Sequence, residues 1–296
     1  MKQRFRIGIS PCPNDTFAFH ALITGAVELP FEAEFVIKDV EELNRLVLSG
    51  GLDISKVSFH LAGRVLADYM ILNSGAALGR GCGPLLIAGS RLDPRLLQGE
   101  RIAIPGRNTT AALLLKLFLS ELGMDIDTLD QSLEEMLFSK IPDAVASGRV
   151  RAGLIIHESR FTYCEKGLVE LEDLGRWWEE TTGMPIPLGC IVGSRRLGPG
   201  LLARLDAALE KSIEAAHDRP GPAMDFAARY AQEISPDVMS KHIALYVNSF
   251  TTDMGQEGRA AVRTLFKRAH EAGILPAESP GAPFDDQDGI GSIFVE

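Results

Sequence analysis

Short polar stretches follow three apolar, strand-like segments of this chain, where helix-like patterns begin. They are NDT at residues 14–16, KVS at 56–58 and NTT at 108–110. In an open α/β sheet, ligands collect at the carboxyl ends of the strands, where free backbone N–H groups at helix starts attract anionic oxygen. We therefore expect these three junctions to surround one cleft that binds a small, oxygen-rich molecule.

The same junctions have a simpler explanation, because Asp, Ser and Thr are common helix N-caps. Asp15, Ser58 and Thr109 could each do no more than satisfy a backbone N–H at a helix start. The last junction differs, because Thr109 and Thr110 provide two consecutive hydroxyls where a cap uses one. Gly106 before them also permits close approach to the backbone. From the residues alone, ligand binding and capping both stay open.

A histidine ends another apolar, strand-like run, AGLII at residues 152–156. An imidazole titrates near neutral pH, so His157 at the carboxyl end of a strand is well placed to move protons. The alternative is a structural histidine with satisfied ring nitrogens. The remaining histidines lie in helical patterns and are expected to be structural or solvated: His20, His60, His217, His242 and His270.

Familiar metal and cofactor motifs fail in this sequence. HESRF at residues 157–161 begins like the zinc-protease motif HExxH, but Phe161 occupies the position of the second ligand. GRGCGP at residues 79–84 begins like GxGxxG, but Pro84 replaces the last glycine. There is no phosphate loop, no GxSxG nucleophile motif and no CxxC pair. We therefore expect neither a metal nor a cofactor.

Composition limits the class of protein. The 296 residues, 46% of them hydrophobic, suffice for two domains with their own cores. The formal net charge of -10 argues against a nucleic-acid partner, because phosphate contacts need clustered Lys and Arg. The basic start leads into no apolar signal segment, and no apolar run reaches the roughly 18 residues that cross a bilayer. We expect a cytoplasmic protein without membrane insertion.

The patterns along the chain predict two α/β domains. Strand-like and helix-like segments alternate through the first two thirds, and helical periodicity dominates from about residue 201. Two Gly- and Pro-rich stretches, 79–90 and 181–196, each lead into an apolar strand, and we interpret them as crossovers between domains. The predicted domains are a larger, discontinuous one and a smaller, inserted one: 1–91 with 189–296, and 92–188. No function is predicted for the tail from about residue 277.

Ordered segments along almost the whole chain carry a family resemblance. Among them are SPCPNDTFAFHAL, DISKVSFHLAG, AIPGRNTTAALLL, HESRFTY and HIALYVNSFTTDMG. Through these segments the sequence resembles the 1,4-dihydroxy-6-naphthoate synthases of the futalosine route to menaquinone. The resemblance implies a periplasmic-binding-protein-like fold of type II, with two α/β domains, two crossovers and the substrate held between the domains.

The resemblance also implies a reaction and the residues that perform it. Enzymes of this family are lyases that cleave carbon–carbon bonds of cyclic dehypoxanthinyl futalosine and release 1,4-dihydroxy-6-naphthoate, without a redox cofactor. The family's proton acceptor falls on His157. Its substrate contacts fall on Lys56, Val57, Ser58, Thr109 and Thr110. Residues in shared segments that are candidates to line the cleft are Asn14, Asn44 and Arg80.

Three other functions fit the predicted fold. A solute-binding protein without catalysis shares it, but His157 and the missing export signal argue against that function. A ligand-sensing regulator would need a helix-turn-helix segment, and none precedes the α/β region. The sister chorismate dehydratase of the same pathway shares the architecture, whereas the segments PCPNDTF and HESRFTY favour the synthase.

Overall fold

The structure is a computed structural model that describes residues 4–157, 159–231, 235–275 and 292–296. Most of the tail from about residue 277 therefore lies outside the described residues. Within the described ranges, no helix is long and apolar enough to cross a membrane.

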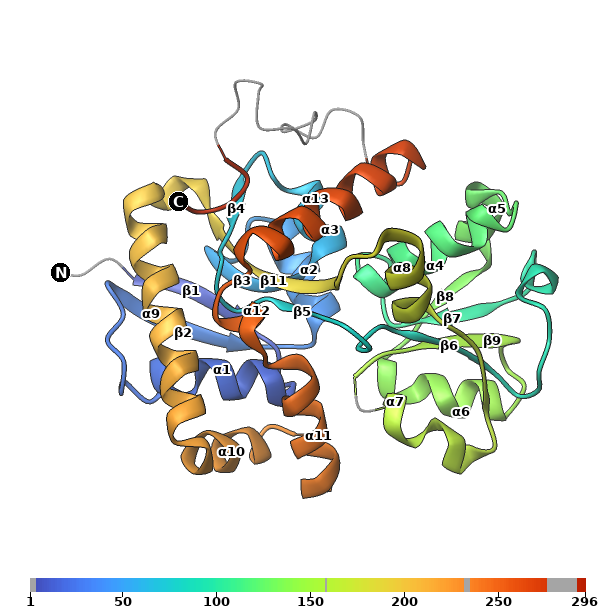
Figure 1. The fold of residues 1–296 in the computed structure, drawn as a ribbon, viewed down its shortest axis with the longest axis horizontal. Helices are drawn as coiled ribbons and strands as arrows, with labels where there is room; N and C mark the ends of the chain where they lie inside the picture. Colours follow the sequence, from blue (N-terminus) through green and yellow to red (C-terminus); the bar gives the residue numbers. More distant parts are fainter. Residues whose placement is uncertain (1–3, 158, 232–234, 276–291) are drawn as a thin grey trace.

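Two separate β-sheets form the centres of two lobes that lie side by side (Figure 1). The first sheet has the strand order β2-β1-β3-β11-β4, and β5 also pairs with β11. Its strands are β1 (Arg4–Ile9), β2 (Glu32–Ile37), β3 (Ile54–Ser58), β4 (Tyr69–Ile71), β5 (Ala77–Gly79) and β11 (Ile186–Ser194). Strand β1 is parallel to β2 and β3, and β11 is antiparallel to its neighbours.

The second sheet has the strand order β10-β6-β9-β7-β8. Its strands are β6 (Leu85–Ala88), β7 (Ile102–Ile104), β8 (Leu133–Glu135), β9 (Ala152–Ile155) and β10 (Val169–Asp173). Strand β7 is parallel to β8 and β9, whereas β6 is antiparallel to β9 and β10. Two α/β lobes with mixed sheets confirm the predicted fold class.

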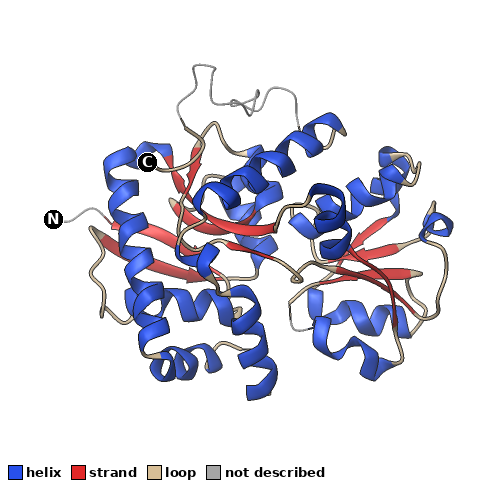
Figure 2. Cartoon of the chain, viewed as in Figure 1, coloured by secondary structure: helices blue, strands red, loops and turns tan. Residues whose placement is uncertain are grey.

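Helices surround both sheets (Figure 2). Those of the first lobe are α1 (Pro13–Ile23), α2 (Val40–Leu48), α3 (Phe59–Arg64), α9 (Pro199–Asp218), α10 (Pro220–Ala228), α11 (Pro236–Tyr246), α12 (Ser249–Thr252) and α13 (Gly255–Glu271). Those of the second lobe are α4 (Thr110–Glu121), α5 (Ile126–Ser132), α6 (Ile141–Ala146), α7 (Ser159–Thr162) and α8 (Leu174–Thr182). Among the described residues, the elements that follow β11 are helices and include no strand, as the periodicity of the last third predicts.

The helix starts differ in how they are capped. The Asp39 side chain accepts a hydrogen bond from a backbone N–H at the start of α2, and Thr109 does so for α4. Cys12 and Ser58 precede α1 and α3 and make no such side-chain bond. Other groups satisfy part of these two helix starts, because the Asp15 N–H donates to the carbonyl oxygen of Cys12 and the His60 N–H donates to Thr110 Oγ1.

A fully buried strand and a nearly fully buried helix lie where the lobes meet. All five residues of β3 are buried, because β3 lies between β1 and β11 in the sheet. Helix α4 is buried from Thr110 to Leu119, since it packs on α3 and β11 of the first lobe and on α8 and β9 of the second. A helix that is apolar on nearly all sides needs such enclosure.

The chain crosses between the lobes at two places. Strand β6 already pairs in the second sheet, so the first crossing is residues 80–84, between β5 and β6. This crossing precedes the sequence-based boundary at 91/92, because the apolar strand after the Gly- and Pro-rich lead-in belongs to the second sheet. The second crossing leads from α8 into β11, and the boundary expected at 188/189 falls inside that strand. The exact division into domains stays a prediction.

Two glycines touch at the first crossing. A Cβ atom on Gly83 would lie 2.3 Å from the backbone N and Cα of Gly175, the second residue of α8. The N–H of Leu174 also donates to the carbonyl oxygen of Pro84 at 3.0 Å. The start of α8 therefore packs in direct backbone contact with the first crossing.

We expect the substitution Gly83→Ala to destabilise the protein, because neither backbone can move aside cheaply. The free energy of unfolding should fall by about 1 to 3 kcal/mol, the usual cost of overpacking. Gly89→Ala is the matched control, since a Cβ atom at Gly89 meets no atom within 4 Å. It should change stability by less than about 0.5 kcal/mol. Denaturant unfolding of both variants tests this, and equal stabilities would contradict it.

Candidate active site

A cavity between the two lobes brings the three predicted junctions together. The cavity has a volume of about 80 Å³. Most of the predicted site residues line it, namely Asn14, Lys56, Val57, Ser58, Thr109, Thr110 and His157. Apolar side chains, including Val40, Ile156 and Leu188, complete its walls. The predicted convergence of helix starts on one cleft is therefore present.

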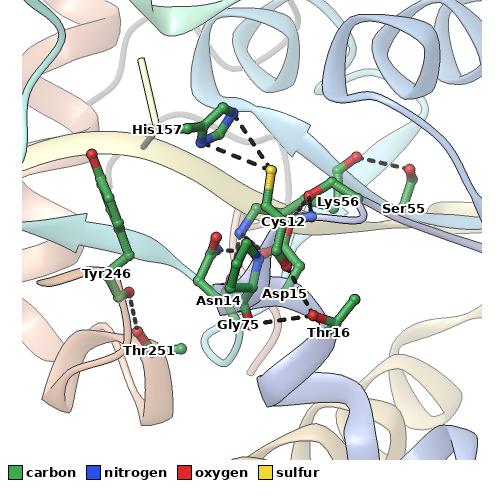
Figure 3. Close-up of polar contacts among 12 residues, drawn as sticks. Cys12, Asn14, Asp15, Thr16, Ser55, Lys56, Gly75, His157, Tyr246 and Thr251 are labelled. Carbon is green, nitrogen blue, oxygen red and sulfur yellow. Dashed lines mark hydrogen bonds and ion pairs between the residues drawn. The ribbon is translucent and has the colours of Figure 1, made fainter. Parts of the chain in front are cut away.

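A buried ion pair forms one side of the cavity (Figure 3). Lys56 Nζ lies 2.8 Å from Asp15 Oδ1, and each side chain is only 6% exposed. The same carboxylate accepts hydrogen bonds from Ser10 Oγ at 2.5 Å and from Asn14 Nδ2 at 2.8 Å. Lys56 also donates to the carbonyl oxygen of Gly75 at 3.2 Å. This network joins the ends of β1 and β3 to the start of α1.

The network continues to a second imidazole. His242 Nε2 lies 2.9 Å from Asn14 Oδ1, and since the Asn14 amide nitrogen already donates to Asp15, the imidazole is the donor. Burial, with a smaller contribution from His157, lowers the pKa of His242 to about 3, so this ring is neutral. Its ring packs at a tilt of 43° on the ring of Tyr246, which lines the cavity, with 4.6 Å between centroids.

Ser58 and Asn44 form a hydrogen-bonded pair. Asn44 Oδ1 accepts from the Ser58 backbone N–H at 3.0 Å, and Asn44 Nδ2 donates to Ser58 Oγ at 3.3 Å. No bond among the described residues uses the Ser58 hydroxyl proton, which stays available at the cavity wall. Asn44 itself is fully buried behind Ser58 and does not border the cavity.

The two threonine hydroxyls are engaged within the protein. Thr109 Oγ1 donates to the carbonyl oxygen of Gly106 at 2.7 Å and accepts from the Ala112 N–H, so it is a helix cap. Thr110 Oγ1 donates to the carbonyl oxygen of Leu188 at 2.6 Å and accepts from the His60 N–H at 3.2 Å. Thr110 thus ties the start of α4 to α3 and β11.

The backbone N–H groups at the start of α4 can bind a ligand, although the two threonine hydroxyls are engaged. The backbone N–H groups of Thr110 and Ala111 have no acceptor among the described residues, and both residues line the cavity. They carry the positive end of a 12-residue helix, which favours a carboxylate or an oxyanion. The sequence indicates this junction but not Ala111, whose contribution comes from its backbone alone.

His157 has an unusual backbone. Its φ angle is 55°, the only positive φ of a non-glycine residue within the described ranges. Such a conformation costs of order 1 kcal/mol or more, and it clusters at functional sites. The ring contacts Phe138 edge to face at 5.1 Å, and Cys12 Sγ lies 3.6 Å from its Nε2 (Figure 3). Because Cys12 belongs to the first lobe, this contact bridges the cleft.

Arg80 lies away from the cavity. Its guanidinium donates to the carbonyl oxygen of Gly183 and pairs with Glu257, both at 3.1 Å, and the side chain is half exposed. Among the described residues, no cluster of three His, Cys, Asp or Glu side chains could hold a metal ion. No local sequence pattern indicates the contributions of Cys12 and His242, because the partner of each lies far away along the chain.

Two lobes with an interlobe cavity define a periplasmic-binding-protein-like protein. The alkanesulfonate-binding protein of Xanthomonas axonopodis pv. citri, solved with bound MOPS, shares this fold with a TM-score of 0.66 and 16% identity. The match covers 92% of this chain and 94% of that one. A solved protein from Archaeoglobus fulgidus gives a TM-score of 0.82 with 34% identity, over 92% of this chain and 98% of that chain.

The chain belongs to the menaquinone biosynthesis family, whose model matches residues 5–271. A Thermus thermophilus protein named 1,4-dihydroxy-6-naphthoate synthase is 47% identical over 278 residues, which cover 94% of this chain and 98% of that protein. A Streptomyces coelicolor protein of the same name is 43% identical over 280 residues, covering 94% and 96%. These matches confirm the family resemblance.

Two buried histidines at the lobe junction predict acid sensitivity. The pKa of His242 is about 3, and burial, followed by the charge of Lys116, lowers the pKa of His60 to about 4. Between pH 6.5 and these values the unfolded chain binds more protons than the folded one. The free energy of unfolding should therefore fall as pH falls, by about 1.4 kcal/mol per pH unit for each histidine.

Denaturant unfolding from pH 7 to pH 5 measures this slope. His242→Gln, which keeps a donor near the Nε2 position, should flatten the slope by about one histidine's share. His217→Gln on the exposed side of α9 is the control and should leave the slope unchanged. An identical slope in the wild type and in His242→Gln would mean that His242 does not stay neutral in the folded protein.

Proposed function

We propose that this chain is a carbon–carbon lyase that converts cyclic dehypoxanthinyl futalosine to 1,4-dihydroxy-6-naphthoate in menaquinone biosynthesis, with His157 as general base. The observation that carries the proposal is a histidine in a strained left-handed conformation, at an interlobe cavity that also holds free helix N–H groups. The names of the Thermus and Streptomyces relatives support this product. A cytoplasmic location is part of the same proposal.

The base would act on a carbon next to a carbonyl group. Removal of that proton gives an enolate. When the carbonyl re-forms, a carbon–carbon double bond forms, the bond from the adjacent carbon to its carbon substituent breaks, and that fragment leaves with the bonding pair and takes the proton from the imidazolium. Aromatisation of the product drives the sequence. An imidazole suits this step because its ordinary pKa lies near physiological pH. His157 projects from the second lobe, so the reacting carbon would lie on that side of the cavity.

Charge that develops on substrate oxygens needs donors in fixed positions. The backbone N–H groups of Thr110 and Ala111 and the hydroxyl of Ser58 are such donors, one set from each lobe. Lys56 adds a positive charge that Asp15 holds in place at 2.8 Å. Donors that are already oriented stabilise an oxyanion without the cost of rearranging water. The Thr109 hydroxyl is used as a helix cap, so the role implied for Thr109 would be to hold the start of α4, whose N–H groups contact the substrate.

The apolar walls suit the ring system of the product. Ile156 and Leu188 face the cavity together with Tyr246, so a flat aromatic skeleton would be held by van der Waals contact. Such walls also keep water from a reactive intermediate. Polar groups at one side and apolar walls around them match a substrate that is part sugar and part aromatic.

Solute binding without catalysis is the second candidate, because proteins such as the Xanthomonas alkanesulfonate-binding protein share the fold. Incubation of purified protein with cyclic dehypoxanthinyl futalosine separates the two functions. Appearance of naphthoate absorbance supports the lyase. Tight binding of the compound without product formation would support solute binding, and conversion of chorismate instead would support the sister dehydratase.

We expect His157→Asn to remove turnover while leaving substrate binding largely intact. Asparagine tolerates the left-handed conformation but cannot accept a proton near neutral pH. Turnover should fall by roughly a hundred- to ten-thousandfold, the usual contribution of a general base. His217→Asn, on an exposed face of α9, serves as the control. A folded His157→Asn protein with near wild-type turnover would remove His157 from the mechanism.

Ser58→Ala and Thr109→Ala should differ in their effects. Loss of the Ser58 hydroxyl should weaken binding of 1,4-dihydroxy-6-naphthoate by about 0.5 to 1.5 kcal/mol. It also removes an acceptor of the Asn44 amide, so affinity is the quantity that tests the substrate contact. Loss of the Thr109 cap should lower the free energy of unfolding by about 0.5 to 2 kcal/mol instead, and Thr109→Ser should restore it. Calorimetry and denaturant unfolding measure both quantities. Unchanged affinity in Ser58→Ala would contradict a substrate contact there.

A further inference from the structure

Arg160 lies in α7, the single helical turn that follows His157, and is largely buried, with 16% of its side chain exposed. One arm of its guanidinium donates to the carbonyl oxygen of Gly83. The other arm pairs with Asp173 at 2.7 Å. Its backbone N–H donates to the carbonyl oxygen of His157 at 3.3 Å. One side chain thus joins the His157 turn to two separate parts of the chain.

Both contacts of Arg160 are themselves anchored. Asp173 uses its second carboxylate oxygen to cap α8, accepting from the backbone N–H groups of Gly175 at 2.9 Å and Arg176 at 3.2 Å. Gly83 lies on the first crossing, between Cys82 and Pro84, which both line the cavity. The guanidinium therefore fixes the His157 turn against the cavity wall on the crossing, and a planar fork suits two such acceptors.

The need for such an anchor follows from the backbone of His157. A left-handed non-glycine residue persists only when its surroundings hold it there. The His157 ring contacts Phe138 and Cys12, but these contacts alone do not fix the direction of the chain after His157. Arg160, three residues further on, is the charged side chain that ties this turn to neighbouring segments.

We propose that Arg160 is a positioning residue that holds the His157 imidazole at its place in the cavity. This inference rests on the proposed role of His157 as general base. Arg160 does not line the cavity. It acts through the turn, so its loss shifts the base relative to the reacting carbon and leaves the groups that bind substrate oxygens in place. A misplacement of about 1 Å is enough to reduce turnover about a hundredfold.

The first test compares Arg160→Gln and Arg160→Lys with the control Arg176→Gln. Arg176 pairs with Glu170 and Glu172 in the same lobe but is 57% exposed and does not contact the crossing. We expect kcat to fall about 10- to 100-fold in Arg160→Gln, with a smaller change in KM. Lysine cannot reach both acceptors as a fork and should restore only part of kcat. Wild-type kcat in Arg160→Gln would overturn the proposal.

A second test separates positioning from a general effect on the fold. In a His157→Asn background, single-turnover rates with excess protein should show no further loss from Arg160→Gln, since there is no base left to position. The same fold-loss in both backgrounds would overturn the proposal. If Arg160→Gln does not fold, Arg160→Lys takes its place in the same comparison.

A third measurement does not depend on catalysis by His157. In protein labelled at its histidine rings, the NMR signal that disappears in His157→Asn identifies His157. That signal should shift or broaden in Arg160→Gln and stay unchanged in Arg176→Gln. An unchanged signal in Arg160→Gln would overturn the positioning role. If His157→Asn keeps full turnover while the signal still moves, the general-base proposal fails and the positioning of His157 by Arg160 stands.

Discussion

The ion pair between Lys56 and Asp15 is the interaction on which the site depends. A buried charge is strongly destabilising unless a partner and hydrogen bonds satisfy it. Lys56 comes from β3 and Asp15 from α1, so satisfying these charges fixes a strand and a helix relative to each other. Through Asn14 the same network reaches His242 on α11, which brings a late helix to the first residues of the chain. Ser58 lies two residues after Lys56 in β3, so the ion pair also fixes the position of Ser58.

The two lobes contribute different parts of the chemistry. The Ser58 hydroxyl and the ion pair belong to the first lobe, whereas His157 and the start of α4 belong to the second. Their relative positions therefore depend on bonds across the junction. Thr110 provides one through His60 and Leu188, and Asn108 provides another, donating to the buried carboxylate of Glu41 at 2.7 Å. The cavity is a property of both lobes together.

The sequence predicts the two-lobed fold and the convergence of the three junctions, because both follow from strand and helix alternation and from where parallel strands end. It does not predict how each hydroxyl is used. Thr110 Oγ1 donates to the carbonyl oxygen of Leu188, so the use of this hydroxyl depends on where β11 lies. Arg80 lies in a segment shared with the family, yet its pairing with Glu257 depends on α13. The same limit applies to His242, which local periodicity correctly places on a helix but cannot connect to Asn14.

Strand β11 has a consequence for the order in which the protein can assemble during its synthesis. It lies between β3 and β4 in the first sheet and also pairs with β5, yet it is the last strand of the sheet to leave the ribosome. Until Ser194 has emerged, β3 has an open edge, and β4 and β5 lack their partner. Open strand edges invite pairing with other chains. The second lobe, whose strands lie entirely between Leu85 and Asp173, is complete before that moment and can fold first.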